Sequence, residues 1–270
     1  WFNTLCRFFD VPGFLLDIPF VWREEDQKRH VAYVTGQLRE FIAFLERVTG
    51  RPFDWARLQE AVATLKRAAT LRQEGMKLCR HKPSPASFFD WAISLGPVNF
   101  LAGWPGTAEY FQSLKDELEE RIAQGVGAVP EESCRLLFDG IILWPKVGAL
   151  ADKFASLDAC AIAGRYTHLG FYNEPERIDP EEPLQSIADF VVRSVLNRTP
   201  QWQARAAVQL CREYDLDGVA VHALHTCRPF DVAQHDIIET VSRELGLPVG
   251  VFEGDHGDVN YYSDAQVNTR

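Results

Sequence analysis

The spacing of apolar residues divides the chain into a helical segment and a segment in which strands alternate with helices. Apolar positions recur with helical spacing over residues 31–45 and again over residues 58–71. The turn TGRPFD separates these runs, and it places Gly50 at the end of the first helix and Asp54 at the N-cap of the second. Thr107 is placed to cap a third helix. Residues 25–129 are therefore predicted to form a helical layer.

From Pro130 onward the pattern changes to four apolar runs that are typical of buried strands: RLLFDGIIL, ACAIAGRYT, DGVAVHA and LPVGVFEGD. Helical runs separate them, and the strands lack the polar alternation of a sheet with one face in water. Such strands are typical of a parallel sheet that helices cover on both faces. Residues 130–270 are therefore predicted to form an open α/β domain of the flavodoxin-like or Rossmann-like kind.

The N-terminal run DVPGFLLDIPF is predicted to be one more strand of this type. The chain starts at Trp1 within a patterned run, and it stops directly after the polar stretch YYSDAQVNTR. We therefore expect residues 1–24 to be the end of a preceding α/β domain that lies mostly outside this sequence.

Composition narrows the classes of function. The chain has 46% hydrophobic residues, which is typical of a soluble globular protein. Its formal charge of -10 argues against a surface for nucleic acid or for an anionic membrane. No apolar run approaches the roughly 18 residues of a membrane-spanning helix, and no signal segment opens the chain. We expect a cytoplasmic protein, in which a local basic pocket can still bind a phosphorylated coenzyme.

Six cysteines are spread along the chain without a close pair, which argues against a zinc ribbon or finger. A chain of this size does not need disulfides to stabilise its core. Cys160 lies in an apolar strand-like run and Cys211 at an apolar helical position, so both are expected to be packing residues.

Cys227 differs because it lies in the stretch HTCRPFDVAQHD, between a strand over 219–223 and a helix predicted to begin at Asp231. This loop is at the carboxyl edge of the predicted sheet, where such folds bind ligands. Pro229 suits the first helical turn, and free amides of that helix end would stabilise a Cys227 thiolate. A metal or cluster ligand is favoured over a nucleophile, and a loop cysteine without a role remains an alternative. His225 and His235 are candidate bases or ligands, or structural residues.

The C-terminal motifs, in their order, resemble the 2-hydroxyacyl-CoA dehydratase and benzoyl-CoA reductase family. A strand ends in a cysteine loop, ELG-P leads to a strand that ends in EGD, and a tyrosine-containing S-AQ--TR motif follows. Upstream, FLLDIPF, YVTGQLREFIAFLERVTGRPFD, RLLFDGIILWP and YTH are also similar to the family, so that the resemblance covers nearly the whole chain.

The resemblance implies a subunit with two similar α/β domains that hold a 4Fe-4S iron-sulfur cluster through cysteines. Cys227 matches the C-terminal ligand of that cluster. The other cluster cysteines of the family belong upstream of Trp1, and Cys6 lies after their place in a helix-like run, so we expect Cys6 to be a packing residue. The cluster would need an open iron site to bind the substrate oxygen as a Lewis acid.

The activity implied by the resemblance is radical dehydration of (R)-2-hydroxyacyl-CoA to enoyl-CoA. An ATP-dependent iron-sulfur activator protein would supply one electron, and a homologous second subunit would complete a heterodimer. The alternatives are a dearomatising benzoyl-CoA reductase subunit, a noncatalytic electron-relay subunit, and a thiol enzyme in which His225 is the base for Cys227.

Several residues near Cys227 are candidates for binding the acyl-CoA. Arg228 could pair with a CoA phosphate or with the cluster, or remain a solvated loop residue. Glu253, Asp255 and Asp258 can reach the same sheet edge, where they could orient substrate or cap turns. Tyr261 and Tyr262 are expected either to pack over the cluster loop or to close the domain. The tryptophans are expected to be core or interface residues: Trp22, Trp55, Trp91 and Trp202.

Overall fold

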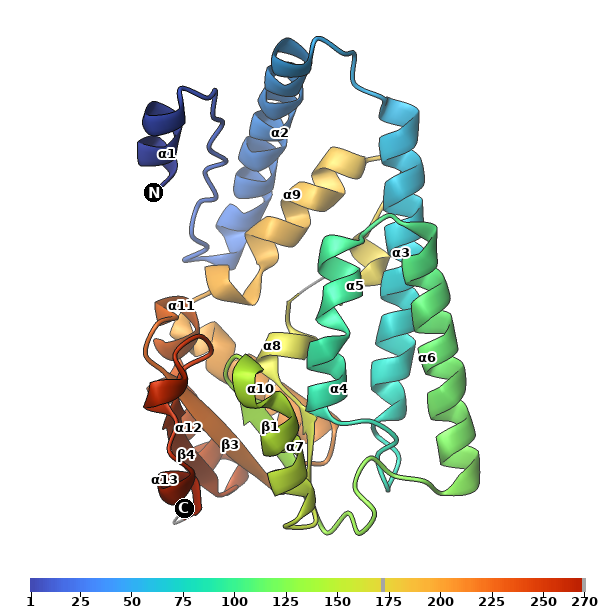
Figure 1. Ribbon diagram of the computed structural model, residues 1–270, viewed down its shortest axis with the longest axis vertical. Coiled ribbons are helices and arrows are strands. Elements are labelled where there is room, and N and C mark those ends of the chain that lie inside the picture. Colours follow the sequence, from blue (N-terminus) through green and yellow to red (C-terminus); the bar gives the residue numbers. More distant parts are fainter. Residues whose placement is uncertain (171–172, 269–270) are drawn as a thin grey trace.

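The computed structural model describes residues 1–170 and 173–268, so Thr269 and Arg270 of the C-terminal motif lie outside the described residues. The first part of the chain is helical (Figure 1). Its helices are α1 (Phe2–Phe9), α2 (Gln27–Thr49), α3 (Trp55–Leu78), α4 (Phe88–Ile93), α5 (Leu95–Phe100) and α6 (Pro105–Gln124), with a 3-10 turn at Glu24–Asp26.

The second part alternates strands and helices. The strands are β1 (Cys134–Asp139), β2 (Ala159–Ala163), β3 (Gly218–Leu224) and β4 (Val249–Gly254). The helices are α7 (Val147–Ala155), α8 (Arg165–His168), α9 (Pro183–Arg193), α10 (Pro200–Glu213), α11 (Arg228–Asp231), α12 (Gln234–Leu245) and α13 (Asp264–Asn268). Short 3-10 turns lie at Trp144–Lys146, Pro175–Arg177, Val195–Asn197 and Val259–Tyr261.

The four strands form one parallel sheet in the order β2-β1-β3-β4. Helices α10 and α12 pack on one face, against Leu137 and Val221, and α4 and α7 pack on the other, against Phe138 and Ala161. Apolar residues on both faces explain why the strands lack polar alternation. The predicted open α/β fold is therefore confirmed, and its strand order begins as in flavodoxin-like sheets.

The helical layer is also confirmed. Gly50 ends α2 with φ 66°, and the Asp54 side chain accepts a hydrogen bond from the Arg57 amide at the start of α3. Thr107 is not the N-cap of α6, because Pro105 begins that helix one turn earlier and suits its first position. Helix α9 packs against α2, so that residues on both sides of the predicted boundary at residue 130 share one core. The division into separate domains stays a prediction.

The predicted N-terminal strand is wrong. Residues 11–20 form no strand, and a single β-bridge joins Val21 to Arg198. Proline residues at positions 12 and 19 remove backbone donors that a strand needs. The Gln37 side chain instead bonds both the amide and the carbonyl of Asp17, at 2.8 and 2.7 Å, and Phe14 packs against Phe41 at 5.3 Å. This segment therefore lies along α2.

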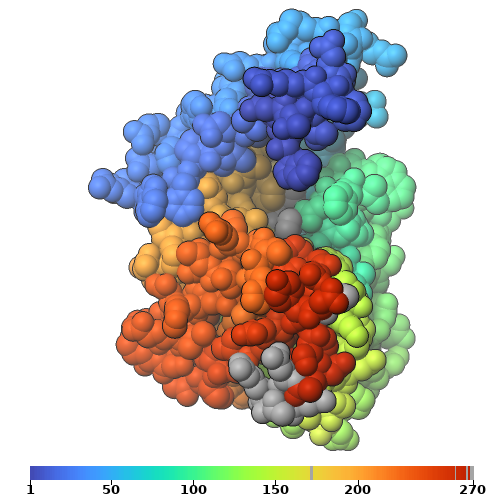
Figure 2. All heavy atoms as spheres, turned by 60° about the vertical axis from the view of Figure 1, so that its left-hand side comes forward, coloured from blue at the N-terminus to red at the C-terminus, as the bar shows by residue number. Residues whose placement is uncertain are grey.

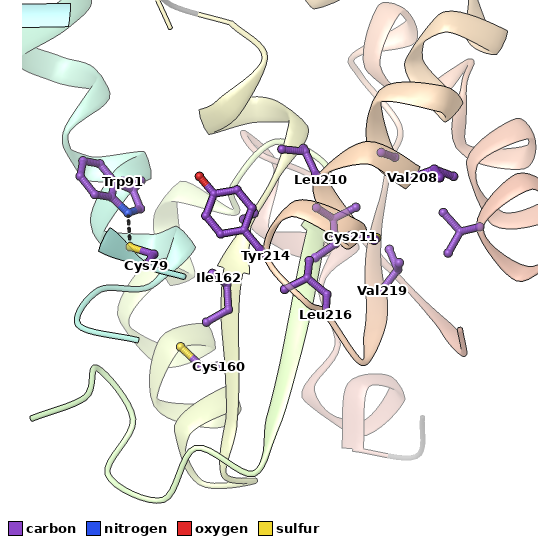
Figure 3. Packing of buried hydrophobic residues seen from close by; sticks show 14 of the residues in the cluster. Cys79, Trp91, Cys160, Ile162, Val208, Leu210, Cys211, Tyr214, Leu216 and Val219 are labelled. Atoms are coloured by element: carbon purple, nitrogen blue, oxygen red, sulfur yellow. Dashed lines mark hydrogen bonds between the residues drawn. The ribbon is translucent and has the colours of Figure 1, made fainter. Parts of the chain in front are cut away.

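All six cysteines are free thiols, and three of them are core residues (Figure 3). Cys160 is fully buried in β2 and Cys211 is buried in α10, which confirms both as packing residues. Cys79 is also buried and accepts a hydrogen bond from the Trp91 indole at 3.2 Å, which places Trp91 in the core as expected. Burial raises the pKa of Cys79 to about 11 and that of Cys211 to about 12. These thiols stay protonated at neutral pH.

Within residues 1–170 and 173–268, no helix has the length and apolar character needed to cross a membrane.

Figure 2 shows one face of the molecule, with the N-terminal residues at one end and the C-terminal α/β residues at the other. Trp22 and Trp55 are 75% and 49% exposed, so neither is a core residue of this chain.

Candidate functional site at the carboxyl edge of the sheet

The carboxyl ends of all four strands meet at one edge of the sheet because the strands are parallel. The loop after β3 contains Cys227, and it lies next to the end of β1 and the end of β4. The strand order reverses between β1 and β3, and ligands of open α/β sheets bind at such a reversal. The structure therefore confirms the predicted position of Cys227 at the carboxyl edge.

The helix after Cys227 differs from the prediction. Asp231 does not begin it; a four-residue helix, α11, runs from Arg228 to Asp231, and α12 begins at Gln234. Pro229 lies in the first turn of α11, as expected, and its fixed φ starts the helix directly after Cys227. A four-residue helix followed by the twelve-residue helix α12 thus replaces the single predicted helix.

The expected stabilisation of a thiolate by free amides is also wrong in its detail. The amides of Phe230 and Asp231 donate to the backbone carbonyl of Cys227, at 3.1 and 3.0 Å. Within the described residues, the Cys227 thiol accepts no capping hydrogen bond. The half-buried thiol instead lies against an apolar cluster of Val195, Leu224 and Phe230. The amides at this helix end therefore bind the backbone of the loop and do not bind the Cys227 sulfur.

Asp255 connects the end of β4 to the cysteine loop. One carboxylate oxygen accepts the amide and the hydroxyl of Thr226, at 3.1 and 2.6 Å, and the other accepts the amides of Gly257 and Asp258. Burial alone would raise the pKa of Asp255, but these hydrogen bonds outweigh it and lower that pKa. Both oxygens of this 1% exposed residue are used, so the structure supports the capping alternative for Asp255.

The other predicted substrate-binding residues lie nearer to solvent. Arg228 is exposed as the first residue of α11, and Glu253 is exposed within β4, opposite Ala223. Asp258 accepts the backbone amide of Asn260 at 2.9 Å, which makes it a turn cap. Of these predicted residues, Asp255 thus bonds to the loop from another strand, and a role in substrate binding for Arg228 and Glu253 stays a prediction.

The histidines near the loop have partners of their own. The ring of His225 stacks on Tyr261 with 4.5 Å between centroids, and His235 is exposed on α12. Because the His225 ring stacks on Tyr261, nothing in the described residues pairs it with the Cys227 thiol, and its role as a base stays a prediction. Tyr262 lies beside Lys146, whose amine is 5.8 Å from the ring centroid. Tyr261 therefore packs over the loop, and Tyr262 closes the neighbouring side of the domain.

Sequence reasoning missed a buried polar network below the loop. Arg165 and Asp139 are both fully buried, and they form a two-pronged ion pair in which Nη2 lies 2.9 Å from Oδ2. Gln203 accepts from the remaining Arg165 nitrogen, Nη1. A signal was present, because Asp139 ends one strand and Arg165 follows another after a single glycine, but periodicity does not show which charges meet. Two segments that are 26 residues apart thus meet under Cys227.

Tyr166 was also missed. Burial, followed by the nearby Cys227 sulfur, raises the pKa of its phenol, and a hydrogen bond with Trp144 acts in the opposite direction. Its ring packs edge-on against Phe230 at 6.0 Å. Tyr166 is therefore a protonated phenol at the same edge as the thiol.

Cys227 can supply one thiolate ligand to a metal or a cluster. Among the described residues, no group of three His, Cys, Asp or Glu side chains could hold a metal ion. Cys6 lies in α1 against Gly13, where a β-carbon would lie 2.5 Å from its sulfur, so it packs within its own segment. Residues 1–170 and 173–268 thus fit one ligand position of a cluster and do not complete one by themselves.

The fold and the edge site define an open α/β protein with a helical layer and a loop thiol at the strand-order reversal. Comparison with protein families extends this description: the family 2-hydroxyglutaryl-CoA dehydratase, D-component, matches residues 1–270. The chain belongs to this family, which confirms the resemblance.

Curated relatives are similar over the whole chain. A benzoyl-CoA reductase subunit from Thauera aromatica is 28% identical over 282 residues, with 65% of that protein covered. The alpha subunit of lactoyl-CoA dehydratase from Anaerotignum propionicum is 25% identical, with 64% covered. The alpha subunit of (R)-2-hydroxyglutaryl-CoA dehydratase from Acidaminococcus fermentans is 26% identical, with 55% of that protein covered. The chain thus spans between 55% and 65% of the length of these three relatives.

Proposed function

We propose that this chain is part of an enzyme subunit that dehydrates a (R)-2-hydroxyacyl-CoA to an enoyl-CoA. The observation that carries the proposal is the family match over residues 1–270, together with a loop thiol at the ligand-binding edge of the sheet. Relatives from four organisms are named as 2-hydroxyacyl-CoA dehydratase subunits, which favours dehydration. Dearomatising reduction of benzoyl-CoA is the second candidate, because the benzoyl-CoA reductase subunit has the highest identity among these relatives.

We further propose that Cys227 is one ligand of a 4Fe-4S cluster. Its sulfur is half-buried against apolar side chains, and the backbone of its loop is fixed on both sides, as a cluster ligand requires. The remaining ligands would come from residues other than those described. When bound, the cluster would supply single-electron chemistry at this edge of the sheet.

The residues of this chain would serve that chemistry by position. Arg228, exposed beside Cys227, is placed to pair with a phosphate of the acyl-CoA, and exposed Glu253 lines the same edge. Tyr166 remains protonated and keeps a phenol hydroxyl near the thiol. Asp255 would act by holding Thr226, since both of its oxygens are already used.

The names of the relatives, which are subunits of enzymes that act on acyl-CoA thioesters, support an acyl-CoA substrate and a second subunit. We propose a homologous second subunit and an ATP-dependent iron-sulfur activator that delivers the electron. A pure electron relay differs in one respect: acyl-CoA would leave the magnetic resonance signal of a relay cluster unchanged and would perturb that of a catalytic one.

Anaerobic purification of the full-length protein that contains this chain tests the proposal. We expect a brown protein with iron and sulfide, and turnover of 2-hydroxyacyl-CoA when the activator, ATP and the second subunit are added. Turnover of benzoyl-CoA alone would select the second candidate. A colourless, iron-free protein that is alkylated selectively at Cys227 would contradict the cluster and support a thiol enzyme.

A further inference from the structure

Two buried side chains hold the loop of Cys227 from its two ends. On one side, the carboxylate of Asp255 accepts the amide and hydroxyl of Thr226, the residue before Cys227. On the other side, Nη2 of Arg165 donates to the carbonyl of Phe230 at 3.2 Å, and the amide of Phe230 donates to the carbonyl of Cys227 at 3.1 Å. The cysteine thus lies between two residues that other parts of the sheet edge fix in place.

The guanidinium of Arg165 is held rigidly. Its Nε and Nη2 atoms bind the two oxygens of Asp139 at the end of β1, and its Nη1 atom binds Gln203 on α10. The guanidinium carbon also lies 4.4 Å from the centroid of the Phe230 ring, and Phe230 is 1% exposed. Because a guanidinium donates in fixed, planar directions, these contacts set where the Phe230 carbonyl lies.

Helix α11 cannot hold this shape by itself. It has four residues, and the carbonyl groups in the last turn of a helix have no partner within it. Single helical turns are unstable without outside contacts, because nucleation costs more than one hydrogen bond returns. Arg165 supplies a charged donor to one of these carbonyls, so the conformation of the turn depends on it.

We propose that Arg165, oriented by Asp139, is a positioning residue that holds the Cys227 thiol where a cluster ligand is needed. The role in cluster binding rests on the function proposed above, whereas the role in holding the loop does not. A buried ion pair is often no more stabilising than apolar residues of similar volume, so stability alone gives little reason for this pair. Its specific contribution is a single conformation of the turn after Cys227.

The chain offers a matched control at the opposite edge of the sheet. Arg135 is also buried and pairs with Glu132, and it donates to the carbonyls of Cys79 and His81 at 2.8 and 3.2 Å. It is chemically equivalent to Arg165, but its hydrogen-bond partners among the described residues all lie at the amino edge, away from the Cys227 loop. A general effect of losing a buried arginine would appear at both positions.

The test measures the alkylation rates of the six cysteines within residues 1–270 by mass spectrometry. The full-length protein is first stripped of iron anaerobically with a chelator, and iodoacetamide is then added to the wild type, Arg165→Lys, Asp139→Asn and Arg135→Lys. We expect the Cys227 rate to rise about tenfold in the first two variants, the effect of losing one hydrogen bond to a charged group. The rates of buried Cys79, Cys160 and Cys211 should not change in these two variants, and Arg135→Lys should leave the Cys227 rate unchanged.

An unchanged Cys227 rate in folded Arg165→Lys overturns the proposal. An equal rise of all six rates in both Arg165→Lys and Asp139→Asn also overturns it, because the ion pair then supports the whole fold rather than the loop. Asp139→Asn keeps the shape of the side chain and decides the question if Arg165→Lys does not fold. In parallel, we measure the rate at which variants that still contain iron lose it to a chelator. Faster loss than in the wild type supports the role in cluster binding. Unchanged loss, together with a raised Cys227 alkylation rate, overturns that role. If the wild type contains no iron but the alkylation pattern is as expected, the proposed function is contradicted, whereas the role of Arg165 in holding the loop stands.

Discussion

The sheet has a buried arginine at each edge, and the two arginines hold different kinds of structure. At the amino edge, Arg135 donates to the carbonyls of Cys79 and Tyr214, where α3 and α10 end. At the carboxyl edge, Arg165 donates to the carbonyl of Phe230 in a helix of four residues. The same chemistry therefore joins rigid layers at one edge and shapes a loop at the other.

The cysteines at the two edges differ in the same way. Cys134 is the first residue of β1 and pairs with Ala159 of β2, and burial raises its pKa. Cys227 has a similar degree of burial but lies outside any strand. Its loop is held by hydrogen bonds with the side chains of Arg165 and Asp255. Burial alone does not distinguish these thiols, and their position relative to the strand ends does.

The largest expected effect on stability lies at the amino edge. Arg135→Met would leave the carboxylate of Glu132 buried without its partner and should lower the free energy of unfolding by about 3–5 kcal/mol. Urea unfolding measures the change. Arg80→Met, which removes a partly exposed ion pair with Glu213, should change the free energy by less than about 1 kcal/mol and is the matched control. Equal effects of the two substitutions would show that the amino-edge network does not join the layers.

Replacing a buried cysteine should have a smaller effect. Cys160→Ser places a hydroxyl in the apolar interior of β2, where Cys160 is 0% exposed, at a cost of roughly 1–3 kcal/mol. Cluster assembly in the folded protein should be unchanged. Cys134→Ser, in the neighbouring strand and half-buried, should cost less than Cys160→Ser in the same urea titration. A Cys160→Ser protein that loses its iron while it stays folded would contradict the assignment of Cys160 to the core.

The pattern of apolar residues was sufficient to predict the parallel sheet, because strands that are buried on both faces are apolar throughout. It was not sufficient for residues 11–20, where Gln37 rather than a neighbouring strand satisfies the backbone of Asp17. The position of Cys227 was predictable from the loop after an apolar strand. The Arg165–Asp139 pair was not, because local periodicity shows that a residue is buried but not which distant side chain it meets.

A pH-dependent effect is expected from His168, a buried residue beyond the end of β2. Its Nδ1 atom accepts the Gly164 amide, and burial followed by the charge of Arg72 lowers its pKa from 6.5 to about 3. The contribution of the neutral ring is complete above pH 6.5 and declines as the pH falls from 6.5 towards 3, because only the unfolded chain binds the proton. The slope is at most about 1.4 kcal/mol per pH unit.

His168→Gln should remove this part of the dependence, so the free energy of unfolding should fall less between about pH 7 and pH 5 than in the wild type. Urea titrations at several pH values measure both slopes. Parallel slopes for the two proteins would show that His168 takes up its proton in the folded state at its ordinary pKa.

The iron content of the Cys227→Ser variant tests the central claim most directly. A loop thiol that is only half-buried contributes little to folding, so the free energy of unfolding should change by less than about 1 kcal/mol. The full-length protein, purified anaerobically, should lose its cluster iron and its turnover together, whereas Cys134→Ser at the opposite edge should keep both. A Cys227→Ser protein with full iron content and full activity would contradict the account.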